Sequence, residues 1–359
     1  MKHLHVIKND KFTDNFILFI KNNFKFKNHF FLIIGDPNKS KNEVSTLNYD
    51  NIIKLNTLRN LKNLFIFEKS IYKYNKIHFH GLFNWNLVKI LYLQPWLLKK
   101  SNWIIWGGDL YYYEKPKNAW RKKLHEFTRK KVIKRFNEIT SFIPGDYDIA
   151  KKIYNTKAIY HNAMTYNISA DNKYLDKLIK ENKKENKKIV FQVGNSADSR
   201  NNHFEILKKL KEFKNRKIEI IVPLSYWDKK YRKKVINYGK KHFGTKFKPL
   251  TEFYGLKDYL KILNQIDVGI FNHKHQQGLG NITKLLRLGK KVYLNSDVST
   301  WDYFKDIGVK VYDTKKIYDE NFESIINYNS TTLKNNIKAI KKIRSTQYRV
   351  KQWKKILNT

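Results

Sequence analysis

Residues suited to binding an anion gather between Val268 and Leu294, in the stretch VGIFNHKHQQGLGNITKLLRLGKKVYL. An apolar run leads to a polar loop, two glycines follow, and a helix is expected from Asn281. The residues that could contact a bound anion or sugar are Asn272, His273, Gln276, Gln277, Gly278, Gly280, Asn281 and Lys284. A helix start presents unpaired N–H groups and the positive end of the helix dipole, so a phosphate is stabilised there. No residue from Asn272 to Leu288 is acidic.

The alternative for this loop is that its polar residues and glycines only turn the chain and cap a helix, without any ligand. A second polar loop, GNSADSRNNH, follows the apolar run 189–193 and poses the same choice. Its candidate ligand-binding residues are Gly194, Asn195, Ser196, Asn202 and His203. Eight polar residues in ten exceed what a helix cap needs, so this loop also predicts ligand contacts.

A candidate general base is Asp109, which follows the run WIIW and two glycines in WIIWGGDLYYY. A carboxylate at the carboxyl end of a strand could deprotonate an acceptor hydroxyl. The alternative is a turn or capping residue.

The sequence favours chemistry without a metal. His78 and His80 share one face of an expected strand, but no third ligand accompanies them. Asp146 and Asp148 form a DxD pair at a helix start, where capping explains them better. The absence of cysteine excludes disulfides and thiolate chemistry. We therefore expect no metal and no cofactor.

The segment 115–136 carries ten Lys or Arg against one Glu, and Trp120, Leu124 and Phe127 fall on one face of the expected helix. Such a helix can lie on an anionic membrane. Its expected membrane-facing residues are Trp120, Arg121, Lys122, Lys123, Arg129, Lys130 and Lys131. The alternative is that the aromatic stripe packs on the core and the cations form a solvated face.

The formal net charge is +42, from 73 basic and 31 acidic residues. Lys, Asn, Ile, Tyr and Phe are abundant while Arg, Ala, Gly and Pro are scarce, as AT-rich codons would produce without selection for binding. The resulting positive field still attracts nucleotides, anionic lipid or nucleic acid.

Strand-like apolar runs alternate with helical patterns along the chain, which predicts an α/β fold with parallel sheets. Expected strands are 3–7, 30–34, 64–67, 77–80, 103–106, 139–143, 189–193, 218–222, 247–250, 267–271 and 292–294. The pattern predicts two doubly wound, Rossmann-like domains facing a central cleft, at 1–170 and 189–330, joined by a charged linker at 171–188. The segment 331–359 is expected to be helical and to pack back on the first domain. No run approaches the length of about 18 apolar residues that a membrane span needs.

Several segments resemble one known family. GNSADSRNNH, FNHKHQQGLGNI, LGKKVYL, WIIWGGDLYYY and IPGDYDIAKKIYNTKAIYH are similar to the 4-alpha-L-fucosyltransferase family, glycosyltransferase family 56, and the likeness runs from about Trp103 to Asp313. The resemblance implies a GT-B fold and transfer of 4-acetamido-4,6-dideoxygalactose from a TDP donor to an undecaprenyl-diphosphate-linked saccharide, as in enterobacterial common antigen synthesis. It also implies a peripheral position on the cytoplasmic side of the inner membrane.

By analogy with other GT-B donors, the nucleobase would lie near Phe247 and Leu250. Many GT-B enzymes carry two glutamates eight positions apart around the donor loop, and these positions are Gln276 and Lys284 here. Ribose recognition must therefore differ, and Lys284 or Arg287 could neutralise the departing diphosphate.

Two other functions compete with this assignment. A sugar-nucleotide epimerase shares the fold and needs no lipid acceptor. A nucleic-acid-binding protein would use the charge and the aromatic residues, but the aromatics lie within helix and strand patterns and no recognition motif is present. We therefore expect no nucleic-acid partner.

Overall fold

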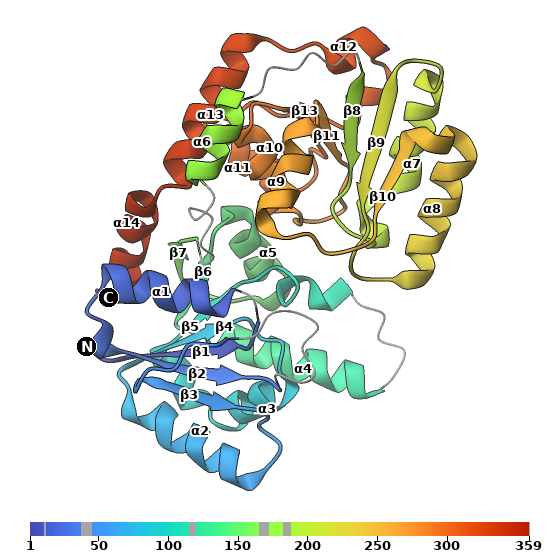
Figure 1. Cartoon of the computed structure of the whole chain (residues 1–359). Coiled ribbons are helices and arrows are strands. Elements are labelled where there is room, and N and C mark those ends of the chain that lie inside the picture. The colour runs from blue at the N-terminus through green and yellow to red at the C-terminus, as the bar shows by residue number, and fades with distance from the viewer. Residues whose placement is uncertain (11, 37–44, 115–119, 165–171, 182–187, 359) are drawn as a thin grey trace. The chain divides into compact units, whose positions relative to one another are not determined.

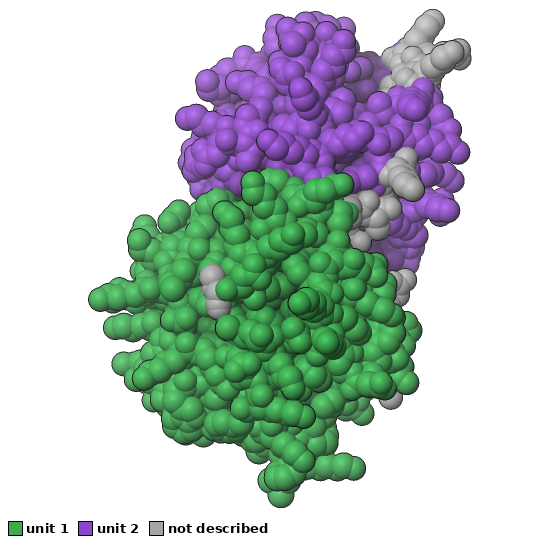
Figure 2. Space-filling model, turned by 90° about the vertical axis from the view of Figure 1, so that its left-hand side faces the viewer, with its two compact units in different colours: residues 1–167, 346–359 green, residues 168–345 purple. Residues whose placement is uncertain are grey.

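Short apolar runs form the strands of two parallel sheets, because a strand covered by helices on both faces can be apolar throughout. The computed structural model describes residues 1–10, 12–36, 45–114, 120–164, 172–181 and 188–358. They form two compact units, residues 1–167 with 346–359 and residues 168–345, drawn in green and purple in Figure 2. The prediction of two doubly wound α/β units is confirmed.

Unit 1 contains a sheet in the order β3-β2-β1-β4-β5-β6-β7, with all pairs parallel (Figure 1). The strands are β1 (His3–Lys8), β2 (His29–Ile34), β3 (Ile52–Leu55), β4 (Lys76–His80), β5 (Ser101–Ile104), β6 (Glu138–Ser141) and β7 (Ile159–Asn162). Its helices are α1 (Thr13–Asn23), α2 (Leu61–Lys73), α3 (Trp85–Leu93), α4 (Trp120–Lys134), α5 (Pro144–Tyr154) and α14 (Thr346–Leu357), with 3-10 turns η3 (Pro95–Lys100) and η4 (Leu110–Glu114).

The helices of unit 1 cover the two faces of its sheet unequally. Helices α2 to α5 pack on one face in a single hydrophobic cluster. Helices α1 and α14 pack on the other face around Phe16, Ile356 and Trp353. The last helix of the chain therefore belongs to the first unit, as Figure 1 also shows.

Five histidines lie in the core of unit 1, where β1, β2 and β4 run side by side. They are His3, His5, His29, His78 and His80, and each is at most 3 % exposed. Their rings contact one another, with nitrogen–nitrogen distances of 3.2 Å for His3–His78, 3.2 Å for His5–His80 and 3.1 Å for His5–His29. Burial lowers the pKa of every one of them, to about 4 for His3 and about 3 for His29 and His80. The cluster is neutral near pH 7.

Unit 2 contains a sheet in the order β10-β9-β8-β11-β12-β13, also parallel. Its strands are β8 (Ile189–Val193), β9 (Ile218–Pro223), β10 (Phe247–Leu250), β11 (Val268–Phe271), β12 (Lys291–Leu294) and β13 (Tyr312–Asp313). The helices are α6 (Asn172–Glu181), α7 (His203–Leu210), α8 (Lys229–Phe243), α9 (Leu256–Gln265), α10 (Leu279–Arg287), α11 (Ser299–Asp306), α12 (Phe322–Ile326) and α13 (Ser330–Ile343).

Several predicted elements differ from the structure. The expected strand 64–67 lies inside α2, because a short apolar run does not distinguish a strand from a buried helical turn. The described part of the expected linker, 172–181, is α6, and Asp176 on it forms an ion pair with Arg287 of α10. Residues 171 and 182–187 lie outside the described residues. The expected C-terminal helix is interrupted at 344–345, so that α13 belongs to unit 2 and α14 to unit 1.

Within the described ranges, no helix is both long and apolar enough to cross a membrane.

Candidate functional site

The loop after β8 is fixed by buried side chains. Gly194 has a φ of +67°, and a Cβ on it would lie 2.5 Å from His203 Nε2, so no larger residue fits without displacing the imidazole. His203 begins α7, is fully buried, and has its Nδ1 3.2 Å from the Tyr231 hydroxyl. Burial lowers the pKa of His203 to about 4, so the ring is neutral near pH 7.

Asn201 holds the same loop in place. Its Oδ1 accepts a hydrogen bond from the Asn195 N–H at 3.0 Å, and its Nδ2 donates to the Ser196 and Asp198 carbonyls. Asn195 is 5 % exposed and donates to the Tyr226 hydroxyl at 3.1 Å. Burial opposes ionisation of Asp198, but hydrogen bonds and charge from Arg200 outweigh it and lower the pKa of this carboxyl. Hydrogen bonds within the chain therefore hold the loop in this conformation.

The loop after β11 is joined to the first loop by Asn272. Its carbonyl accepts a hydrogen bond from Asn202 Nδ2 at 3.0 Å, and its side chain contacts Glu205 and Thr314. His273 follows, 1 % exposed, with its pKa lowered to about 3, chiefly by burial and further by the charges of His275 and His203. The two predicted loops therefore form one layer at the carboxyl edge of β8 and β11.

Gly278 is the point where the two loops meet the start of α10. Its φ is +67°, and a Cβ on it would lie 2.8 Å from Asn195 Oδ1 and 3.1 Å from His273 Cε1. By contrast, a Cβ on Gly280, in the first turn of α10, would meet no atom within 4 Å. The helix start therefore has open space in front of it and two buried polar side chains beside it.

Polar atoms without a partner accompany this helix start. Among the described residues, Asn195 Oδ1, His203 Nε2, His273 Nε2 and Gln277 Nε2 are buried and make no hydrogen bond. Buried polar groups normally have hydrogen-bond partners. Unpartnered groups beside a helix N-terminus therefore indicate a bound ligand that provides the missing partners. A neutral imidazole can donate one hydrogen bond to a phosphate or sugar oxygen.

The other predicted residues of the anion loop lie just before α10 or on it. Gln276 is half-buried just before Gly278, and Asn281 hydrogen-bonds to the Tyr259 hydroxyl. Lys284 lies half-buried in the second turn of α10. Arg287 is 1 % exposed and paired with Asp176, so its role is structural and it does not neutralise a diphosphate.

The predicted nucleobase region is only partly accessible. Phe247 is 3 % exposed and packs under Gly239 of α8, so it belongs to the core and cannot contact a base. Leu250 is half-buried at the end of β10. Tyr226 and Phe253, which the sequence analysis does not single out, are exposed side chains on neighbouring loops, and their rings stack at 6.2 Å between centroids and 14° between planes. In the sequence, the signal that could have drawn attention to them is their position just after β9 and β10, at the carboxyl ends of two strands.

Asp109 in unit 1 does not have the geometry of a general base. It is 1 % exposed, and its Oδ2 accepts hydrogen bonds from Trp103 Nε1 at 2.7 Å and from the Leu82 N–H at 3.1 Å. Its Oδ1 accepts from the Trp106 N–H at 2.9 Å. The carboxylate therefore holds the loop after β5, and the general-base assignment is corrected to a structural one.

The basic helix α4 presents its predicted apolar stripe to solvent. Trp120, Leu124 and Phe127 are 68 %, 45 % and 50 % exposed, so they do not pack on the core. Arg121, Lys122, Lys123, Lys130 and Lys131 are exposed as well. Arg129 is the exception, because it is fully buried and donates to the Leu82 and Asp109 carbonyls. Its expected contact with a membrane is therefore wrong.

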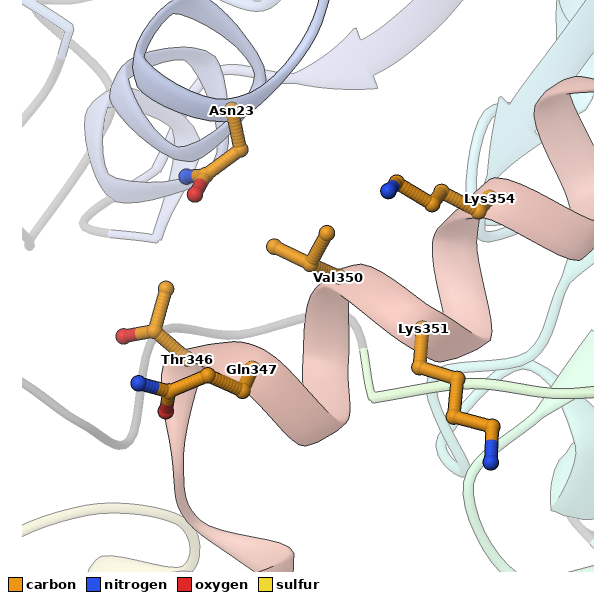
Figure 3. Close-up of a pocket in the computed structure, with 6 residues that line it drawn as sticks. All are labelled: Asn23, Thr346, Gln347, Val350, Lys351 and Lys354. Atoms are coloured by element: carbon orange, nitrogen blue, oxygen red, sulfur yellow. The ribbon is translucent and has the colours of Figure 1, made fainter.

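Two further observations concern possible metal ligands and a hollow in unit 1. Among the residues that the structure describes, no group of three or more His, Asp or Glu side chains is arranged to hold a metal ion. A hollow of about 480 Å³ lies between α1 and α14, where Asn23 faces Val350 while Lys351 extends away (Figure 3). It is in unit 1 and includes none of the predicted site residues.

Solved structures of other proteins share the fold of this chain. The chain is similar to sucrose-phosphate synthase from Thermosynechococcus elongatus (TM-score 0.68, 12 % identity, 100 % of this chain and 98 % of that one). It is also similar to Alr3699/HepE from Anabaena, solved with UDP and glucose (0.66, 10 %, 100 % and 100 %). A third is a UDP-forming trehalose-phosphate synthase from Burkholderia xenovorans (0.66, 9 %, 100 % and 99 %). The fold is that of the GT-B glycosyltransferases.

The family model described as "4-alpha-L-fucosyltransferase glycosyl transferase group 56" matches residues 5–359. The chain belongs to this family and is a glycosyltransferase. This membership confirms the family resemblance and removes the support for the epimerase and nucleic-acid-binding alternatives.

Proposed function

We propose that this glycosyltransferase transfers 4-acetamido-4,6-dideoxygalactose, an amino-deoxy sugar, from a TDP donor to an undecaprenyl-diphosphate-linked saccharide in cell-surface polysaccharide synthesis. The structural observation that supports a nucleotide-sugar donor is the set of buried polar atoms without hydrogen-bond partners at the start of α10. The complex of Alr3699/HepE with UDP and glucose supports a donor of this class. The identity of the sugar and of the acceptor rests on family membership.

The proposed mechanism is electrostatic. The N-terminus of α10, together with the side chains of His203, His273 and Gln277, would bind the diphosphate and stabilise its charge as the sugar leaves. Gln276, one residue earlier, would orient the sugar. The first α10 turns contain no carboxylate, and no metal or other cofactor is part of the proposal.

The acceptor is lipid-linked in this proposal, so the enzyme would work as a peripheral protein on the cytoplasmic side of the inner membrane. The exposed stripe of α4, flanked by exposed cations, supports contact with an anionic surface.

Titration calorimetry with TDP, UDP, GDP and ADP, with and without magnesium, tests the donor site. At an ionic strength of about 0.15 M we expect selective binding of TDP that does not depend on magnesium. Equal binding of all four nucleotides would mean that the net charge alone attracts phosphate. Preference for another nucleotide would leave the glycosyltransferase activity in place but would change the proposed donor from a TDP-sugar to a sugar of that nucleotide.

A matched pair of glycine variants locates the site. Gly278→Ala places a Cβ against Asn195 at a φ of +67°, so we expect the affinity for TDP to fall by about tenfold or more. Gly308→Ala is the control, because its φ is +71° and no atom lies within 4 Å of the added Cβ. Equal loss of affinity in both variants would show that backbone strain, not the site, is responsible.

A further inference from the structure

Helix α2 exposes an apolar strip that the sequence pattern did not reveal. Leu61, Phe65 and Tyr72 are 83 %, 70 % and 52 % exposed, while Phe67 and Ile71 on the opposite side are fully buried. A soluble helix normally places its large apolar residues on the side that faces the core. Helix α2 therefore has apolar side chains on both sides, and the outer ones are mainly exposed to solvent.

The turn between α3 and η3 continues this exposed surface. Leu93 is 71 % exposed and Trp96 is 55 % exposed. Trp96 Nε1 donates to the Tyr72 hydroxyl at 3.1 Å, and Tyr72 donates to Gln94 Oε1 at 2.9 Å. These hydrogen bonds hold the two exposed aromatic rings together, so the end of α2 and the α3–η3 turn form one ordered surface.

Helices α2, α3 and α4 lie on the same face of the sheet, since all three contribute to one core cluster. Their outer sides consequently point away from the sheet in the same general direction. On α1, α5 and α14, the large apolar side chains within the described residues are all buried or half-buried. Among the described helices of unit 1, the large exposed apolar side chains therefore lie on α2, α3 and α4, while Met1, Ile53, Phe83 and Ile159 are exposed outside the helices. Grouping on three helices of one face is expected for an interaction surface rather than for scattered surface residues.

The charge of this layer indicates the occupant. Lys62, Lys69 and Lys73 on α2 are exposed, as are the cations of α4 named above. The layer has few acidic groups: Glu68 accepts a hydrogen bond from Gln94, and Glu126 is 3 % exposed. Exposed apolar and aromatic residues surrounded by lysine fit the head-group region of an anionic bilayer.

We propose that the membrane-binding surface of this protein is the outer side of the whole α2–α3–α4 layer, with α2 as a second insertion element in addition to α4. The inference rests on the membrane-bound acceptor of the proposed function and extends it from one helix to a surface. Leu61 and Phe65 enter the bilayer from α2, Trp120 and Leu124 enter from α4, and Tyr72 and Trp96 lie at the head-group level.

Flotation of the full chain with vesicles tests the surface, using phosphatidylcholine alone and phosphatidylcholine mixed with phosphatidylglycerol. The parent protein is expected to bind the mixed vesicles more strongly. The double variant Leu61→Ser/Phe65→Ser should lower the vesicle partition coefficient by about tenfold or more, and Trp120→Ser/Leu124→Ser by a similar factor. The control Tyr318→Ser/Tyr328→Ser removes two exposed aromatic side chains of unit 2 and should leave the partition coefficient unchanged.

Melting temperature and TDP affinity are measured on each variant, so that misfolding and loss of the donor site are recognised separately. An α2 variant that binds vesicles like the parent protein, while the α4 variant does not, would overturn the inference and leave α4 as the membrane contact. If the parent protein binds TDP but no vesicles, the proposed membrane surface is wrong and the proposed donor site still stands. Self-association that the same α2 and α4 substitutions abolish, without vesicle binding, would make this layer a protein interface instead.

Discussion

The carboxylate of Asp109 accepts three hydrogen bonds from groups of its own unit, and its own carbonyl accepts another from Arg129 Nη2. This arrangement joins the loop after β5 to Leu82, two residues after β4, and to α4. A residue type suited to acid–base chemistry is used here to hold two loops together.

Replacing Asp109 by Asn is therefore expected to destabilise unit 1 by about 1–3 kcal/mol, because an amide presents its NH2 group to N–H donors in place of one oxygen. The free energy of unfolding in urea measures this loss. Transfer activity, assayed well below the melting temperature, should remain. Loss of activity with unchanged stability and unchanged TDP binding would instead restore Asp109 as the general base.

At the scale of elements, α14 is the clearest case of a segment whose partner is distant in sequence. Trp353 is fully buried, stacks parallel to His80 with an angle of 6° between the rings, and donates from Nε1 to the Met164 carbonyl at 2.8 Å. Lys76 Nζ donates to the Ile356 carbonyl at 2.9 Å. The end of the chain thus completes the core of the first unit.

Trp353→Ala should cost about 3–5 kcal/mol of stability, since it leaves a large cavity beside the histidine cluster. Lys355→Ala, an exposed position on the same helix, should change stability by less than about 0.5 kcal/mol. Urea unfolding followed by circular dichroism compares the two. Equal effects would mean that α14 is not part of the folded core of unit 1.

At the scale of the whole molecule, the five buried histidines make unit 1 sensitive to acid. Their pKa values in the folded chain lie below the ordinary 6.5, at about 3 to 4 where a value is given. The unfolded chain consequently binds more protons than the folded chain below pH 6.5, so stability is complete above this pH and is lost as pH falls toward the folded values.

Each histidine that remains neutral in the folded state costs about 1.4 kcal/mol per pH unit below about pH 6. Five such groups cost about 7–10 kcal/mol by about pH 5, which is comparable to the usual stability of a domain, so unit 1 should lose most of its stability near this pH. Urea unfolding at a series of pH values measures the number of protons taken up. A free energy of unfolding that stays constant between pH 7.5 and pH 5.5 would contradict this expectation.

The sequence determined the fold class, because alternating apolar and helical segments leave few arrangements other than parallel sheets covered by helices. It also placed the two polar loops after β8 and β11, since strand ends and glycines are local features. Both loops lie where a doubly wound sheet binds ligands. The glycine-containing turns and the apolar stripe of α4 could be predicted from the sequence because both depend on residues that are close together in the chain.

Only the tertiary structure decided burial. Asp109, Arg129, Arg287 and Phe247 have residue types that suit a catalytic, membrane, phosphate or nucleobase contact, yet each is buried with partners or packing from segments far away in sequence. Leu61 and Phe65 show the opposite: they are apolar residue types suited to a core, yet both face solvent. Whether a side chain meets solvent, ligand or core depends on which elements pack against it, and no local pattern contains that information.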